Sequence, residues 1–167
     1  MPVTPKFVYP SVVPCNQLEH AVPDPYAATY VDWGAVVYSE SPLATIGALN
    51  CSLLAVDFGD AAILAHIYGS TAHPSNPEAY INTVAGMIQE TAENYGRDLT
   101  TGTGLLNVRD MRRKRLLMKE LDGMLLQVTV TTWARHGIHV PGEGMHVFSQ
   151  DNPDPTWEAF VKTMANL

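Results

Sequence analysis

The fold prediction for this chain begins with Thr45–Ser70, TIGALNCSLLAVDFGDAAILAHIYGS. Two apolar runs rich in Leu, Val, Ile and Ala flank the pair Gly59-Asp60, a pattern typical of a β-hairpin with a two-residue turn. A turn at this pair places Leu53 opposite His66 in the hairpin. The stretch therefore predicts a core hairpin with a defined register.

The same register brings a cysteine beside a histidine. Side chains alternate between the two faces of a strand, so Cys51 shares a face with His66 and becomes its diagonal neighbour. Such neighbours lie about 7–8 Å apart at the backbone, within reach of longer side chains. A thiol next to an imidazole is a candidate nucleophile–base pair. A loop longer by one residue would reverse the parity and separate the two groups.

Composition and charge bound the class of protein. The chain has 167 residues, of which 46% are hydrophobic and 16% charged, as expected for one lightly charged globular domain. Its net charge of −7 argues against nucleic acid as the main partner. The segment 107–119 is nevertheless basic, with a net charge of +5 that leaves −12 on the rest. Its basic residues form a solvated helix face, a surface for an acidic partner, or a surface that meets the acidic remainder of this protein.

The sequence contains few residues or segments typical of a metal site, a cofactor site or a membrane span. Cys15 and Cys51 are too few for a disulfide framework or a metal site, although a bridge between them would block Cys51 in an exported protein. His136, His139 and His146 lack further ligands at suitable spacing, so we predict neither metal nor cofactor. No apolar run is long enough for a membrane span and no export signal is recognisable, which predicts a soluble protein without a membrane partner.

The chain divides into three parts. Residues 1–30 hold half of the 12 prolines and form an extended arm, packed either on this domain or on a neighbouring subunit. Residues 31–150 form the main domain, and 151–167 contain a docking helix. We expect an α+β fold, with a mostly antiparallel sheet or two-layer sandwich of about six strands and two main helices packed on it. Expected helices are 78–95, 107–122 and 156–166; expected strands outside the hairpin include 31–39, 124–133, 138–140 and 145–148.

One motif in the hairpin region resembles that of a known family. The run TIGALNC at 45–51, followed by LAH at 64–66, is similar to the core motif of the chemoreceptor glutamine deamidases. These enzymes share a fold and a Cys-His site with the deamidating domain of the cytotoxic necrotizing factor toxins. Their pattern is T-x-G-x-G-S-C, with a histidine on the next strand. The resemblance covers roughly 31–150, and ALN at 48–50 replaces the family's L-G-S.

The resemblance implies a hydrolase that deamidates glutamine side chains of a protein substrate. Cys51 would be the nucleophile, His66 the base and Thr45 the residue that orients His66, with a thioester intermediate and no cofactor. Two alternatives stay open. The chain is either a deamidase-like fold that has lost activity, or a non-catalytic subunit of a homo-oligomer or larger assembly. In the latter, the arm and the C-terminal helix contact neighbours and Cys51 is a small core residue.

Overall fold

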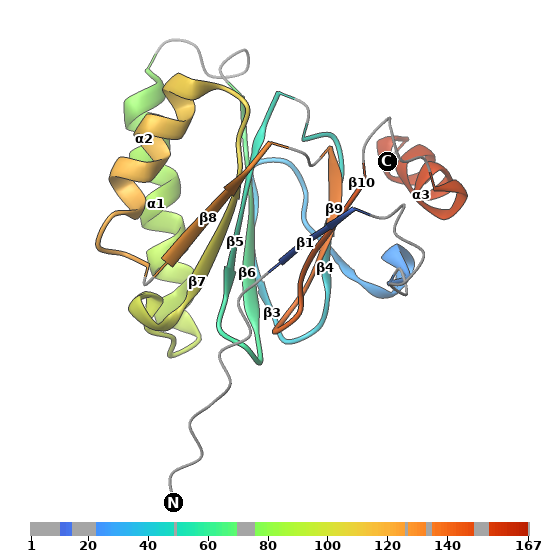
Figure 1. Cartoon of the computed structure of the whole chain (residues 1–167), viewed down its shortest axis with the longest axis horizontal. Helices are drawn as coiled ribbons and strands as arrows, with labels where there is room; N and C mark the ends of the chain where they lie inside the picture. Colours follow the sequence, from blue (N-terminus) through green and yellow to red (C-terminus); the bar gives the residue numbers. More distant parts are fainter. Residues whose placement is uncertain are drawn as a thin grey trace, which may run out of the picture.

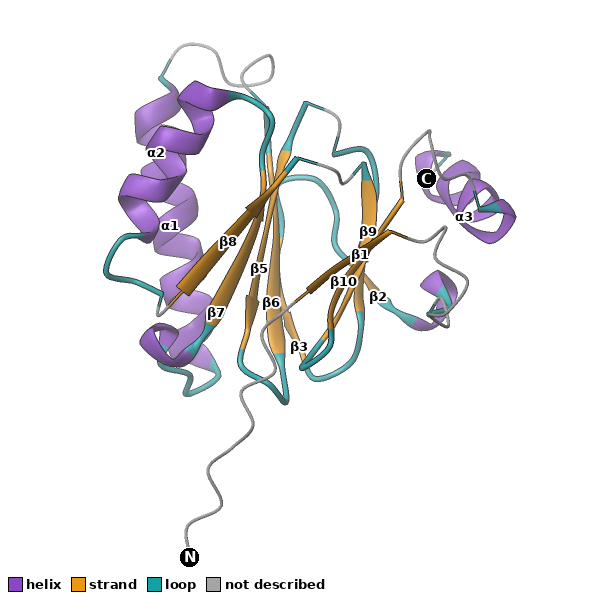
Figure 2. Cartoon of the chain, in the orientation of Figure 1, coloured by secondary structure: helices purple, strands orange, loops and turns teal. Residues whose placement is uncertain are grey.

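Two β-sheets stacked face to face form the centre of the protein, with helices on both outer sides (Figures 1 and 2). The structure is a computed structural model, and it describes residues 11–14, 23–48, 50–69, 76–125, 127–132, 135–148 and 154–166. The expected α+β class, with helices packed on sheets, is confirmed. The ten strands of the two sheets exceed the number expected, mainly because several are very short.

Sheet I contains the predicted hairpin and has the strand order β3-β6-β5-β7-β8. Its neighbours are antiparallel except for β7 and β8, which run parallel. Its strands are β3 (Val36–Ser39), β5 (Ser52–Asp57), β6 (Ala62–Ile67), β7 (Thr103–Asn107) and β8 (Gln127–Thr131).

Sheet II has the strand order β1-β10-β9-β4-β2. Its strands are β1 (Ser11–Pro14), β2 (Thr29–Tyr30), β4 (Leu43–Thr45), β9 (His136–Val140) and β10 (Gly144–Phe148). β9 and β10 form the hairpin expected around residues 141–144. Within the proline-rich segment, β1 runs parallel to β10 of the same chain at the sheet edge, where a strand tolerates proline. Cys15, next in sequence, lies outside the described residues.

The β5–β6 hairpin has the register predicted from its turn. Leu53 lies opposite His66, and the N–H of Phe58 donates to the carbonyl of Ala61 across the turn at 2.8 Å. Gly59 has φ +93°, whereas no described non-glycine residue has positive φ, which is the pattern of a type II′ turn. Both strands are buried along their whole length, so apolar residues occupy both faces instead of alternating, and Ser52, Asp57 and His66 are the polar exceptions.

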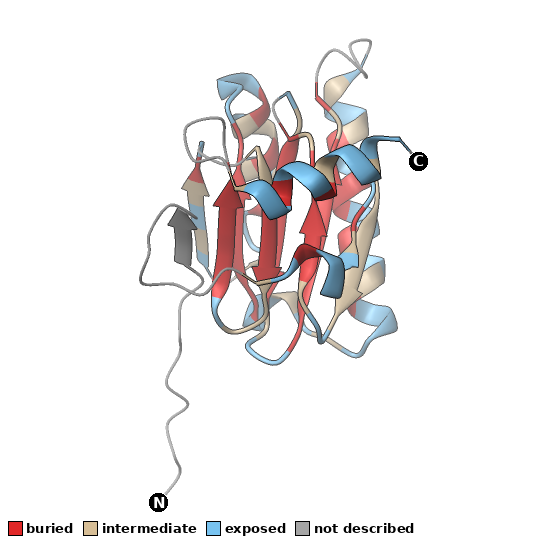
Figure 3. Ribbon diagram, turned by 90° about the vertical axis from the view of Figure 1, so that its right-hand side faces the viewer, coloured by how far each residue is buried: buried red, intermediate tan, exposed pale blue. Residues whose placement is uncertain are grey.

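Three apolar layers hold the helices and sheets together. The first lies between sheet I and helices α1 (Pro77–Asn94) and α2 (Met111–Leu121), the second between the two sheets, and the third between sheet II and α3 (Pro155–Ala165). Figure 3 shows α3 lying across sheet II with its outer face exposed. Two short 3-10 helices, Pro25–Ala27 and Leu99–Thr101, complete the described elements. None of the helices described here is long and apolar enough to cross a lipid bilayer.

Helix α1 confirms the clearest periodicity in the sequence. Asn76 caps it by accepting a hydrogen bond from the N–H of Ala79, and Pro77 occupies the first turn. Its buried side chains recur every three or four residues: Ile81, Val84, Ala85, Ile88 and Ala92. The expected C-terminal helix is confirmed as α3, which Asp154 caps.

The start and inner face of α2 differ from expectation. Asn107, where the expected helix 107–122 begins, is instead the buried last residue of β7, because residues 103–107 pair with both neighbouring strands. The cap is Asp110, whose Oδ1 accepts hydrogen bonds from the N–H groups of residues 112 and 113. Met111, at the start of the helix, is 60% exposed, whereas the basic residue Arg113 is buried.

Candidate functional site

Thr45 and His66 meet in the layer between the two sheets. Thr45 ends β4 of sheet II, and His66 extends from β6 of sheet I toward it. The Thr45 Oγ1 and His66 Nδ1 atoms are 2.7 Å apart, and both residues are buried. Thr45 and His66, which the motif places before and after Cys51, are therefore in direct contact.

The hydrogen bonds of Thr45 fix the tautomer of His66. The Thr45 hydroxyl donates its proton to the carbonyl of Val31 at 2.8 Å, so it can only accept from His66. The His66 proton thus sits on Nδ1 and leaves a lone pair on Nε2. That atom is buried and has no hydrogen-bond partner among the described residues.

His66 is also kept neutral. Burial lowers its pKa from 6.5 to about 4, against the opposing charge of Asp32. The imidazole is therefore an unprotonated acceptor at neutral pH, oriented through its other nitrogen. The unprotonated form is the one that can accept a proton, and a pKa of about 4 makes His66 a weak base.

Cys51 lies at the end of the hairpin closest to His66. It directly precedes β5, is half-buried and makes no disulfide. Continuing the β5–β6 register by one residue pair places Cys51 opposite Tyr68, with His66 on the diagonal. Burial raises the pKa of the Tyr80 phenol on α1, and Cys51 adds to this rise, so the phenol lies within electrostatic range of the thiol. The next positions along are packed tightly, since a Cβ on Gly69 would overlap the carbonyl of residue 50.

Trp33 forms one wall beside His66. Its ring centroid is 6.0 Å from that of the imidazole, and its Nε1 donates to the Ile46 carbonyl at 3.0 Å. Gly47 lies beneath the indole with φ +74°, and a Cβ there would come within 2.8 Å of the ring. The first glycine of the motif is thus required both by backbone conformation and by the tryptophan. Trp33 itself is half exposed, which places this wall at the surface.

Gly47 is anchored from sheet II as well. Its N–H donates to Nδ1 of His136 at 3.0 Å, so this nitrogen of His136 is unprotonated. Burial, together with the charge of Arg135, lowers the pKa of His136 to about 4 and keeps the acceptor in that form. The sequence suggests His136 only as a candidate metal ligand. Its contact with Gly47 depends on the pairing of β9 with β4, which is distant in sequence.

Arg113 reaches the same end of the hairpin from α2. Its Nη1 donates to the Tyr68 carbonyl at 2.7 Å, and its guanidinium lies over the Tyr80 ring at 5.6 Å. Nε and Nη2 are buried without a hydrogen-bond partner in the described part of the chain. The expectation that the arginines of α2 point away from the core is wrong for this one. Arg113 precedes the buried Leu117 by one helical turn, so helical spacing places it on the inner side of α2.

A second buried polar pair lies at the far end of β5. Nε2 of His139 is 2.7 Å from Oδ2 of Asp57, and the Asp57 carboxylate also accepts from the N–H groups of Gly59 and Gly142. Burial raises the pKa of Asp57, but these hydrogen bonds outweigh it and the net pKa is lowered. No group of three potential metal ligands occurs among the described residues. The pair therefore connects the turns of two hairpins.

The chain matches no known protein-family model, and no curated protein is similar to it. The chemistry of the site rests on its own geometry. Two of the three predicted residues, Thr45 and His66, form a buried hydrogen-bonded pair, and Cys51 lies at the same end of the hairpin. A neutral imidazole with a fixed tautomer can accept a proton from a nucleophile that approaches its Nε2.

Proposed function

We propose that this protein is a cysteine-dependent amidohydrolase that deamidates glutamine side chains of a protein substrate. The observation that carries the proposal is the hydrogen bond between Thr45 and His66, because it leaves Nε2 of the imidazole free to accept a proton. Thr45 holds the histidine as the third member of a catalytic triad does. The half-buried, unpaired Cys51 is the nucleophile that this base serves.

The reaction proceeds through a thioester. His66 Nε2 takes the proton of the Cys51 thiol, and the sulfur attacks the carbon of the substrate carboxamide. The protonated imidazole then gives its proton to the leaving nitrogen, which departs as ammonia. Water, deprotonated by the same nitrogen, attacks the thioester, releases glutamate and returns the proton to the thiol. Main-chain N–H groups near Cys51 stabilise the oxyanion, each contributing about 3–4 kcal/mol.

Ammonia release tests the proposal directly. The purified chain is incubated with glutamine-containing peptides and unfolded proteins, ammonia is measured, and conversion of glutamine to glutamate is located by mass spectrometry. We expect Cys51→Ser and His66→Asn to lower the rate by about 10³-fold or more, as loss of a nucleophile or base does. Cys15→Ser, which changes the other cysteine, is the matched control and keeps full activity.

A substrate-independent measurement covers the case in which the true substrate is missing. The rate of Cys51 alkylation by iodoacetamide reports whether the imidazole activates the thiol. We expect alkylation of Cys51 to be slower in His66→Asn than in the parent, with Cys15→Ser as the common background. Equal rates in both would contradict the proposal and favour the non-catalytic alternative.

A further inference from the structure

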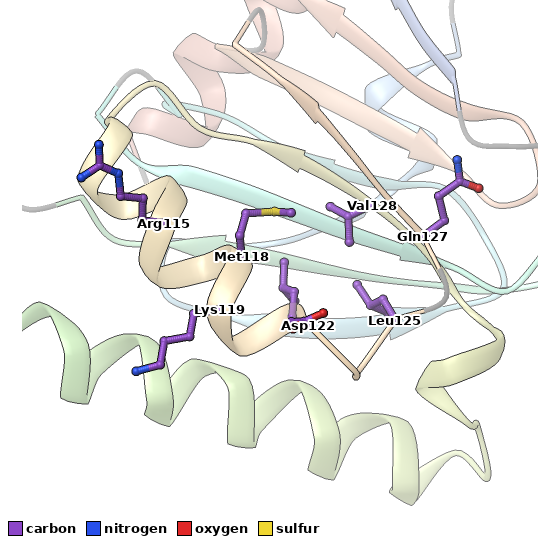
Figure 4. Close-up of a pocket in the computed structure, with 8 residues that line it drawn as sticks. Arg115, Met118, Lys119, Asp122, Leu125, Gln127 and Val128 are labelled. Carbon is purple, nitrogen blue, oxygen red and sulfur yellow. The ribbon is translucent and has the colours of Figure 1, made fainter.

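A groove runs between helix α2 and strand β8, on the side of the molecule away from sheet II. Its volume is about 610 Å³. Figure 4 shows Met118 of α2 pointing across it toward Val128 of β8, with Leu125 at its floor. Met118, Leu125 and Val128 are only partly buried against the core cluster below. The groove therefore presents a strip of apolar surface that the described part of the chain leaves uncovered.

One side of the groove is the edge of sheet I. Strand β8 is the outermost strand, and β7 is its only neighbour in the described sheet. Such an edge offers main-chain N–H and C=O groups to an added strand. The side chains of β8 alternate between exposed and half-buried, so the strand is regular enough to serve as a template. The edge accordingly favours an extended segment over a helical one.

The other side of the groove carries two cations and one carboxylate. The carboxylate is Asp122, at the end of α2. The cations, Arg115 and Lys119, lie one helical turn apart on α2 and are exposed. Lys119 meets Glu78 only at 3.5 Å, with both side chains about 70% exposed, and such a pair is weak. These cations belong to a +5 segment in a chain whose remainder is −12. Their charge is complementary to a partner that carries carboxylates.

We infer that the groove binds an extended acidic segment of a partner protein, which adds to sheet I as a further strand along β8. Its apolar side chains rest on Met118, Leu125 and Val128, and its carboxylates lie at Arg115 and Lys119. Main-chain pairing gives the affinity, while the alternation of apolar and acidic residues gives the specificity. This binding goes beyond the proposed chemistry and does not depend on Cys51.

Peptide selection tests the inference even though the partner is unidentified. The full chain selects from a displayed library of random 12-residue peptides, and a fluorescent copy of the best binder is titrated by anisotropy. We expect peptides in which Asp or Glu alternates with apolar residues. Arg115→Glu/Lys119→Glu should weaken binding by about tenfold or more. Arg112→Glu/Lys114→Glu, the same charge change on the same helix but outside the groove, should change it less than twofold.

Amide hydrogen exchange then locates the contact. Residues 127–131 should exchange more slowly when the peptide is bound, and Cys51→Ser should bind it as the parent does. The inference is overturned if the library yields no such peptides, if both double variants weaken binding equally, or if protection appears away from β8. A library that yields no such peptides could mean that a second copy of the chain occupies the groove. Analytical sedimentation would reveal this self-association.

Discussion

At the scale of single residues, the burial of His66 makes the stability of the fold depend on pH. Its pKa is about 4 in the folded protein and 6.5 when exposed, so the unfolded chain binds the proton more tightly. Its contribution is fully present above pH 6.5 and is lost as the pH falls through about 4. It amounts to roughly 3 kcal/mol. His136 titrates in the same direction.

Urea unfolding at pH 7.5, 6, 5 and 4 measures this dependence. We expect the free energy of unfolding to fall across the series, and to fall less steeply in His66→Gln, which cannot take up the proton. A slope unchanged by this substitution would assign the pH dependence to other groups.

The tautomer of His66 is a sharper prediction, because it follows from a single hydroxyl. Nitrogen-15 NMR of the parent at pH 7 should show the proton on Nδ1 and an unprotonated Nε2. Thr45→Val removes the acceptor of the Nδ1 proton and should allow the other tautomer, with a loss of activity of about 10-fold or more. A parent spectrum with the proton on Nε2 would remove the basis of the proposed mechanism.

Alanine substitutions at two glycines, Gly69 near the site and Gly86 far from it, distinguish a packing effect from an effect on main-chain flexibility. Gly69→Ala places a Cβ against the carbonyl of residue 50, so we expect it to displace the main chain next to Cys51 and to lower activity. Gly86→Ala, within α1, meets no atom within 4 Å and should stabilise the protein by about 0.5–1 kcal/mol without affecting activity. Thermal unfolding and ammonia release together distinguish the two effects.

At the scale of elements, Asp57 ties the β5–β6 turn to the β9–β10 turn. Asp57→Ala leaves the buried His139 and the N–H of Gly142 without their acceptor. We expect a loss of about 3–5 kcal/mol in the free energy of unfolding. Asp60 lies on the same turn and pairs with Arg97, whose side chain is 25% exposed against 67% for Asp60. Asp60→Ala removes this surface ion pair and should cost about 1 kcal/mol. Urea denaturation compares the two.

The sequence predicts an element correctly where the residues of that element alone contain a periodic pattern or a turn signal. The Gly59-Asp60 turn alone determined the β5–β6 register, and helical spacing determined α1 and α3. Strands β2 and β4 have only two and three residues, too few for a periodic pattern, and depend on partners distant in sequence. Thr45 was predicted as a site residue through the motif, but its position in a second sheet was not.

The start of α2 and the burial of Arg113 show a different limit. Asn107 and Asp110 are both good helix caps, and only the pairing of β7 with two strands decides between them. Arg113 lies on the apolar side of its helix, but a charged residue is expected in solvent unless a partner is known. Its partner is a main-chain carbonyl at the end of β6, which local sequence does not reveal.

At the scale of the whole molecule, α3 covers the outer face of sheet II through two aromatic residues. Trp157 packs on Phe148 at 4.3 Å between ring centroids, and Phe160 packs on Trp157 at 5.3 Å. Trp157→Ala should destabilise the fold by about 3–5 kcal/mol. It should also speed amide exchange in β9 and β10. Met164→Ala, near the end of the helix and partly exposed, is the control with a smaller effect.

The two sheets touch through polar atoms at both ends of the β5–β6 hairpin, Thr45–His66 at one and Asp57–His139 at the other. These two bonds lie at separate places in the apolar layer between the sheets, and they add to its packing in fixing how one sheet is rotated on the other. The Asp57 substitution, although distant from Cys51, should therefore disturb the angle at which Thr45 meets the imidazole. The proposed activity would then decline in protein that is still folded. The size of the decline would report how well sheet II stays aligned over sheet I.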